Sequence, residues 1–257
     1  MTSTAASVLD LLNKALETDF SIKVWVPSLL STDHSNSTVQ IKPLTISQQK
    51  QLLSAAVVQD LLNINFNKLI YTILRENYLS ENIIPFKYLT VLDKLILVLS
   101  IRANINSIYN NFDLNQLISK IQHSSNFEIF VPKTFENSTI KIHCAIPTIE
   151  TEYECEVTRE EVDTDNKEPN EQLQTLVTST ITNELTKVIY KVNIKDQEIV
   201  FNDYTFKERI DILNQLPAFL IEKVLDYALQ YKKEIENYLK INDTETLVIN
   251  SIFFSTV

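Results

Sequence analysis

Apolar positions in the first half of the chain predict a strand pair followed by helices. A short amphipathic helix is expected over residues 4–16. Apolar and polar side chains then alternate over 20–26 and again over 38–41, with a polar turn between them, which is typical of a hairpin. Apolar residues next recur at helical spacing over 52–61 and 66–74, so two helices should follow.

The segment 91–103 is the most apolar helix that the pattern predicts. It is apolar on nearly all sides, so it should lie at the centre of the core. Thr90 can cap its N-terminus, and Thr45 or Ser47 can cap the first helix of the bundle. A smaller helix is expected over 114–121.

The second half of the chain is expected to begin with antiparallel strands. Strand-like patterns cover residues 127–131, 139–144 and 150–157. Residues 187–194 and 198–201 are interpreted as a hairpin that turns at the residues between them.

A polar, acidic segment over residues 158–172 follows the strand expected over 150–157. We interpret it as an exposed loop or mobile linker. Helices are expected over 205–215 and 217–240. The tail 247–254 is strand-like and very apolar, so it should be buried against this domain or against a partner.

These elements together predict an α+β fold in two parts. Residues 1–125 would hold the N-terminal strand pair and the helical bundle. Residues 126–257 would hold the antiparallel hairpins, the acidic loop 158–172 and the C-terminal helices. The length of 257 residues suits one large domain or two small ones.

The chain contains no glycine, whereas ordinary proteins contain about 7%. A P-loop, a dinucleotide-binding fingerprint and a nucleophile elbow all need glycine at fixed positions, so these sites are excluded. Left-handed backbone positions should fall to Asn and Asp, with Asn expected at several helix ends. The Asn-rich and Ile-rich composition is typical of an AT-rich genome, which explains the missing glycine without any functional cause.

The net charge of −10 and the pI near 4.9 argue against binding to nucleic acid or to an anionic membrane surface. The N-terminus lacks a basic start followed by an apolar run, so no secretory signal is expected. The most apolar stretch, residues 91–101, is too short for a membrane span. With two cysteines, these features suggest synthesis in a reducing, cytosolic environment.

Candidate chemistry is sparse. His34 should be a solvated turn residue, and His123 could contact the C-terminal end of a helix. His143, Cys144 and Cys155 form the one metal-like grouping, but a structural zinc site normally takes four ligands from paired motifs. We interpret the cysteines as small, half-buried residues of a hairpin, with a remnant metal site or a disulfide left open.

The acidic run resembles a calcium loop only in part. Asp163 and Asp165 have a suitable spacing, but the motif requires a glycine at its sixth position. Glu160 and Glu161 have no apolar setting that would raise a carboxylate pKa. The residues therefore predict an acidic, non-catalytic protein without cofactor or metal.

One part of the layout is similar to a known family. Residues 40–53 (QIKPLTISQQKQLL) lead from a strand into a helix, and residues 89–103 (LTVLDKLILVLSIRA) form the hydrophobic helix of a bundle. Both resemble the baseplate hub and hub-assembly proteins of T-even-like contractile-tailed phages. The hairpin over 190–201 and the C-terminal helices also fit, so the resemblance covers about residues 25–240.

The resemblance implies a structural virion protein of the tail baseplate, or an assembly factor in the host cytoplasm. Its partners would be other hub or tail proteins, and self-association is compatible with the role. Some relatives carry paired cysteines suggestive of metal, whereas this chain has only Cys144 and Cys155. The alternatives are another structural or adaptor protein of a phage tail or related injection machine, and an enzyme of unknown type.

Overall fold

The predicted α+β class is confirmed, and the chain divides into two compact units. The first comprises residues 1–124 and 238–257, and the second comprises residues 125–237. The computed structural model describes residues 5–33, 37–55, 64–124, 131–160, 169–242 and 245–254.

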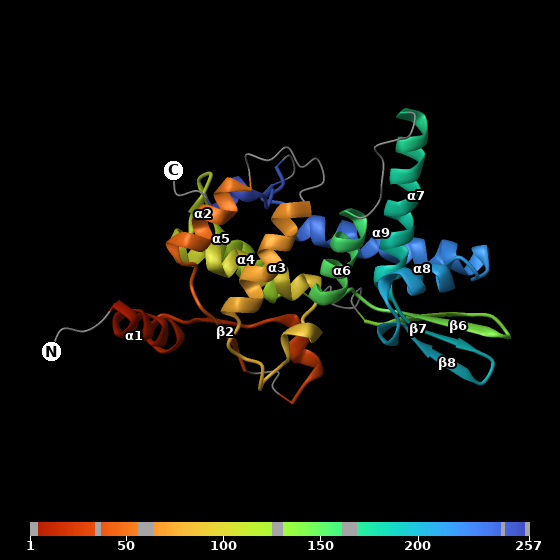
Figure 1. Ribbon diagram of the computed structural model, residues 1–257, viewed down its shortest axis with the longest axis horizontal. Coiled ribbons are helices and arrows are strands. Elements are labelled where there is room, and N and C mark those ends of the chain that lie inside the picture. The colour runs from red at the N-terminus through yellow and green to blue at the C-terminus, as the bar shows by residue number, and fades with distance from the viewer. Residues whose placement is uncertain are drawn as a thin grey trace. The chain divides into compact units, whose positions relative to one another are not determined.

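The first unit is mainly helical, with two small strand pairs (Figure 1). β1 and β2 pair antiparallel, which confirms the predicted N-terminal hairpin. Residues 56–63, which include part of the first expected bundle helix, lie outside the described residues. In chain order its elements are α1 (Ala5–Thr18), β1 (Ile22–Val24), η1 (Pro27–Ser31), β2 (Val39–Ile41), α2 (Ile46–Ser54), α3 (Ile64–Asn77), η2 (Phe86–Tyr88), α4 (Val91–Ile105), β3 (Ile108–Tyr109), β4 (Phe112–Asp113), α5 (Leu114–Gln122) and η5 (Ser251–Phe254).

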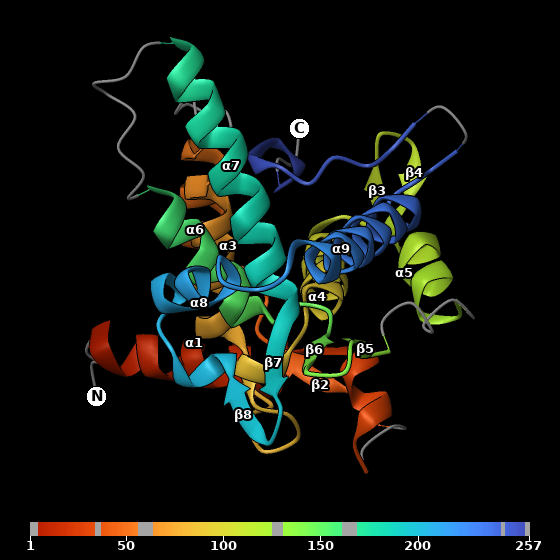
Figure 2. The same ribbon diagram turned by 90° about the vertical axis from the view of Figure 1, so that its right-hand side faces the viewer.

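Helix α4 forms the centre of this unit, as its apolar pattern predicts. Nearly every side chain from Val91 to Arg102 is buried, and α4 lies between α3 and α5 in both views (Figure 2). Thr90 caps the helix in a reciprocal capping box with Asp93, which confirms the predicted cap.

Thr45, and not Ser47, caps helix α2. Its hydroxyl accepts from the backbone N–H of Gln48 at 3.2 Å, and the Gln48 side chain accepts from the Thr45 N–H at 3.1 Å. The Gln48 amide also exchanges two hydrogen bonds with the amide of Asn77 at the end of α3. The strand-to-helix segment 40–53 is thus fixed by local and tertiary bonds together.

The C-terminal tail is not a strand, so that expectation is wrong. It ends in the short 3-10 helix η5, and Phe253 and Phe254 are buried in the first unit. Arg102 Nε donates to the carbonyl oxygen of Phe253 at 2.6 Å. Gln49 Nε2 donates to the carbonyl oxygen of Phe254 at 2.9 Å. Single side-chain donors therefore hold the tail where a sheet ladder was expected.

The second unit places one antiparallel sheet beside helices. The strand order is β5-β6-β7-β8, and the β7–β8 pair confirms the predicted second hairpin. The expected C-terminal helices are also confirmed. Its elements are β5 (Lys133–Glu136), β6 (Ile140–Cys144), α6 (Ile149–Glu160), α7 (Pro169–Val188), β7 (Ile189–Ile194), β8 (Gln197–Val200), η4 (Phe201–Asp203), α8 (Phe206–Leu213) and α9 (Ala218–Tyr238).

One expectation in this unit is wrong, and two are tested only in part. Residues 150–157 form part of helix α6 and not a strand, because Glu is a good helix former and its first turn carries Glu150 and Glu152. The expected loop 158–172 is helical at both ends, while 161–168 lie outside the described residues. The expected strand 127–131 falls almost entirely outside them too.

Turns without glycine use Asn, as predicted, and also Lys. Asn110 and Asn111 have φ of 48° and 65° in the two-residue turn between β3 and β4, which is the type I′ position where Asn-Gly is usual. Lys195 takes a φ of 54° in the β7–β8 turn. The Asn residues that end α4 and α8, Asn106 and Asn214, have φ of −158° and −64°, so left-handed Asn is not found at these helix ends.

Candidate functional site

Two of the three histidines lie within the described residues, one in each unit. His34 lies outside the described residues. His123 ends helix α5, where its Nδ1 donates to the carbonyl oxygen of Ser119 at 2.8 Å, which confirms the expected helix-end contact. His143 lies on β6 with Nε2 donating to Asn193 Oδ1 at 2.7 Å. Its Nδ1 lies 3.0 Å from the hydroxyl of Thr134, so both ring nitrogens tie neighbouring strands together.

The two cysteines do not share a hairpin, contrary to the expectation. Cys144 ends β6, whereas Cys155 lies on helix α6. Both are thiols with no measurable exposure, so they are fully buried and not half-buried. Burial raises the pKa of Cys144 to about 12. Within the described ranges, no three His, Cys, Asp or Glu side chains come together as metal ligands.

A buried ionic group that the sequence did not reveal joins α7 to α9. Glu184 accepts from Lys187 Nζ at 2.7 Å and from Lys232 Nζ at 2.6 Å. Burial raises the pKa of Glu184, but the charges of the two lysines outweigh burial and hold the pKa below its usual value. One carboxylate thus links two ammonium groups, one on its own helix and one on α9.

Arg209 makes a second such link, between α8 and α6. Its guanidinium is buried and lies 2.9 Å from a carboxylate oxygen of Glu154. Its Nε also donates to the carbonyl oxygen of Tyr204 at 2.9 Å. Arg209 thus anchors the start of α8 through two nitrogens of its guanidinium, Nη1 to Glu154 and Nε to the Tyr204 carbonyl.

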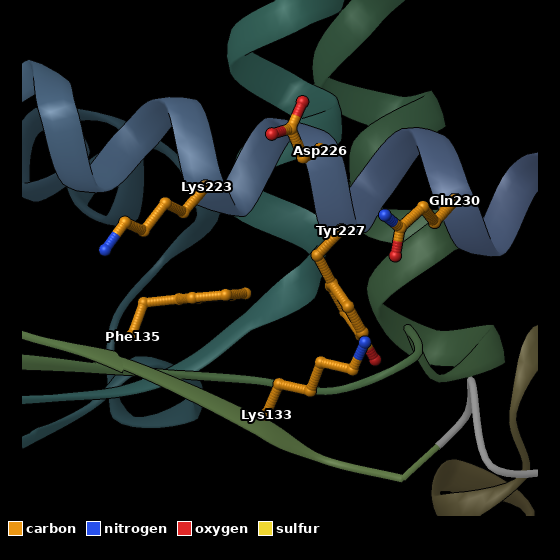
Figure 3. A pocket seen from close by; sticks show the side chains of 6 residues that line it. All are labelled: Lys133, Phe135, Lys223, Asp226, Tyr227 and Gln230. Atoms are coloured by element: carbon orange, nitrogen blue, oxygen red, sulfur yellow. The ribbon is translucent and has the colours of Figure 1, made fainter.

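The most site-like feature of the second unit is a pocket of about 230 Å³ between β5 and α9. Figure 3 shows two side chains rising from β5, with the others carried by α9 above it. Tyr227 points down toward Lys133, while Asp226 points away from the strands (Figure 3). The pocket is lined by Lys133, Phe135, Lys223, Asp226, Tyr227 and Gln230.

Tyr227 is the central residue of this pocket. Only 1% of it is exposed, and its hydroxyl has no hydrogen-bond partner among the described residues. Its ring meets that of Phe135 edge-on at 6.4 Å, and Lys133 Nζ lies 5.7 Å from its ring centroid. Burial raises the pKa of Tyr227 well above its usual value, so the hydroxyl is a neutral donor.

A wider hollow of about 390 Å³ lies in the first unit, beside β1, α4 and α5. Among its lining residues, Lys23 carries the one ionisable side chain. The remainder are aliphatic, hydroxyl and amide groups, including Ser100, Asn104, Asn115 and Gln122. This hollow brings together few ionisable groups. The pocket at Tyr227 is therefore the stronger candidate site.

Sequence reasoning missed the pocket at Tyr227. Lys133 and Phe135 follow a segment predicted to end before them, although the alternation in residues 133–136 is the pattern of an edge strand. Tyr227 falls seven positions after Leu220, the helical repeat that marks the buried face of α9. These two signals identify β5 and the buried face of α9, but they do not predict that the two elements pack against each other to form a pocket.

Comparisons with known proteins add no identity: the chain matches no protein-family model, no curated protein and no solved structure at a significant level. Within the described ranges, no helix is both long and apolar enough to cross a bilayer.

Proposed function

We propose that the chain is a non-enzymatic component or assembly factor of the central hub of a contractile-tail baseplate. It would act through contacts with other hub or tail proteins, in the virion or in the host cytoplasm during assembly. The resemblance of residues 40–53 and 89–103 to hub proteins suggests this role. The observation that carries it is the surface of helix α1.

Helix α1 lies at the edge of the first unit (Figure 1), and several of its large apolar side chains are exposed. Leu9, Leu11 and Leu12 are 60%, 68% and 55% exposed, and Val8 is 43% exposed. Full burial of such a side chain contributes about 1.5–3 kcal/mol, so covering the exposed parts of all four would add about 4 kcal/mol. An apolar helix face of this kind fits the helix-in-groove mode of protein recognition.

Polar side chains elsewhere support a protein that works through surfaces. His143 links strands, Glu184 links α7 to α9, and Arg209 links α8 to α6. Each side chain is held by partners within its own unit. Their chemistry is thus used for structure, in keeping with a scaffold role.

The test is mass spectrometry of purified particles and of assembly intermediates, with copy numbers. A fixed copy number in particles would identify a component, and presence in intermediates alone would identify an assembly factor. Absence from both, together with normal baseplates after deletion of the gene, would refute the proposal. Presence elsewhere in the tail would favour the adaptor alternative.

A matched pair of variants tests the role of α1. The double change Leu9→Ser and Leu12→Ser should leave unfolding unchanged but reduce incorporation into particles or intermediates at least tenfold. Val248→Ser is the control, because Val248 is 62% exposed in the same unit but lies outside α1. Equal incorporation of the double variant and the control would show that α1 is not the docking element.

A further inference from the structure

We propose that the pocket between β5 and α9 binds a hydrophobic carboxylate: an oxyanion held by Lys133 and Tyr227, with its apolar substituent against Phe135. The pocket would take such a ligand whether or not the chain belongs to a phage tail.

The first argument is the hydrogen-bonding capacity left inside the pocket. The hydroxyl of Tyr227 is buried and has no partner in the described parts of the chain. Leaving a buried polar group unpaired costs about 1–3 kcal/mol. Lys133 Nζ lies 5.7 Å from the centroid of the Tyr227 ring, and in Figure 3 the Lys133 and Tyr227 side chains point toward one another. The ammonium group and the hydroxyl offer N–H and O–H donors to one acceptor.

Charge selects an anion. Lys133 and Lys223 face only one acidic lining residue, Asp226, so the pocket is cationic in a chain of net charge −10. Asp226 points away from the strands and leaves the donor end free of negative charge (Figure 3). A carboxylate can accept from several donors at once, and such charge-assisted bonds are about twice as strong as neutral ones.

Size and wall chemistry select the rest of the ligand. The volume of about 230 Å³ is below the range of about 300–1,000 Å³ usual for drug-sized ligands and cofactors. The rings of Phe135 and Tyr227, which meet edge-on, form the aromatic part of its wall. A single residue-sized group with an apolar body and one carboxylate matches both properties, whereas inorganic phosphate would leave the aromatic wall uncovered.

Such a carboxylate can be a free small acid or the C-terminus of a peptide, and titration distinguishes the two. N-acetylphenylalanine, its amide, inorganic phosphate, and a pentapeptide ending in phenylalanine with a free or an amidated C-terminus would each be titrated into the full chain. Backbone NMR shifts and calorimetry would report binding. We expect saturable binding of the free acids, and affinity at least about tenfold lower for each amide. Tighter binding of the peptide than of the small acid would identify a peptide C-terminus as the ligand.

Two variants test the donors. Lys133→Met keeps the side-chain length and should weaken binding of the acid about tenfold, because it removes the cation. Tyr227→Phe removes an unpartnered hydroxyl, so the chain should remain folded while binding weakens about threefold or more. Lys233→Met is the control for Lys133→Met. Lys233 is an exposed lysine of α9, the helix that carries Tyr227, and it does not line the pocket.

Several results would overturn the proposal. These are the absence of saturable binding at 10 mM acid, about equal affinity for acid and amide, or tighter binding of phosphate than of the acid. Equal affinity of Lys133→Met and Lys233→Met would also refute it. The wild-type backbone spectrum serves as the test of folding for each variant, so loss of binding in a folded variant is informative.

Discussion

Asp93 is expected to be the polar side chain on which the first unit depends most. Its carboxylate has no measurable exposure and accepts from two backbone amides, Ser28 N–H at 3.0 Å and Thr90 N–H at 2.6 Å. It also accepts from the hydroxyls of Ser28 and Thr90. One side chain thus completes the cap of α4 and ties η1 to it.

Replacing Asp93 with alanine removes the acceptor for four donors. A hydrogen bond to a charged group contributes about 1.5–3 kcal/mol, and loss of a capping box costs about 1 kcal/mol. The net loss is smaller than the sum, because burial disfavours the ionised carboxylate and raises the pKa of Asp93 against the opposing hydrogen bonds from Ser28 and Thr90. We expect Asp93→Ala to lower the free energy of unfolding by about 3 kcal/mol.

Urea unfolding followed by tryptophan fluorescence measures this change. The single tryptophan, Trp25, lies two residues before η1 and therefore reports on the first unit. With a slope of about 3 kcal/mol per molar urea, the midpoint should fall by about 1 M. Asp113→Ala is the control, because Asp113 caps α5 with a bond to the Asn115 N–H and should cost about 1 kcal/mol. A loss below 1 kcal/mol for Asp93→Ala, or equal losses for both variants, would refute this account.

Three further predictions follow from the turns, thiols and ion pairs. Asn111→Ala should destabilise the first unit by about 1 kcal/mol, because φ is 65° at this position. Asn111→Gly should not destabilise it. An alanine variant that is as stable as wild type in urea would contradict the left-handed turn. In a Cys155→Ser background, Cys144 should react with a thiol reagent at pH 8 only after unfolding, because burial raises its pKa to about 12; rapid labelling of the folded chain would disprove this. Arg209→Lys should lower the free energy of unfolding of the second unit by about 1–2 kcal/mol, since lysine cannot bond both Glu154 and the Tyr204 carbonyl; thermal unfolding by circular dichroism checks it, and an unchanged midpoint would exclude a paired role.

Features set by neighbouring residues could be predicted from the sequence. The cap at Thr90 and the antiparallel hairpins depend on side chains within a few positions of each other. The lack of glycine predicts Asn at left-handed positions, as found at 110–111, although the sequence pattern did not locate that turn. Local signals and the final structure agree at these places.

Features that depend on residues far apart in the chain could not be predicted from the sequence. Alternation of Glu with other residues over 150–157 resembles a strand, yet the segment is helical, and Glu154 pairs with Arg209 far along the chain. The tail looked like a strand because its apolar residues are contiguous, whereas Arg102 and Gln49 decide where it lies. The candidate pocket likewise exists only where β5 meets α9, which no local pattern indicates.

The return of residues 238–254 to the first unit has a consequence for biosynthesis. The continuous segment 125–237 stands in the sequence between the two pieces of that unit. A ribosome therefore delivers the second piece only after the whole intervening segment has been made, and Arg102 of α4 can bond to Phe253 only then. The second unit can therefore complete its fold while the first still lacks its last buried aromatic residues, although the first begins earlier in the sequence.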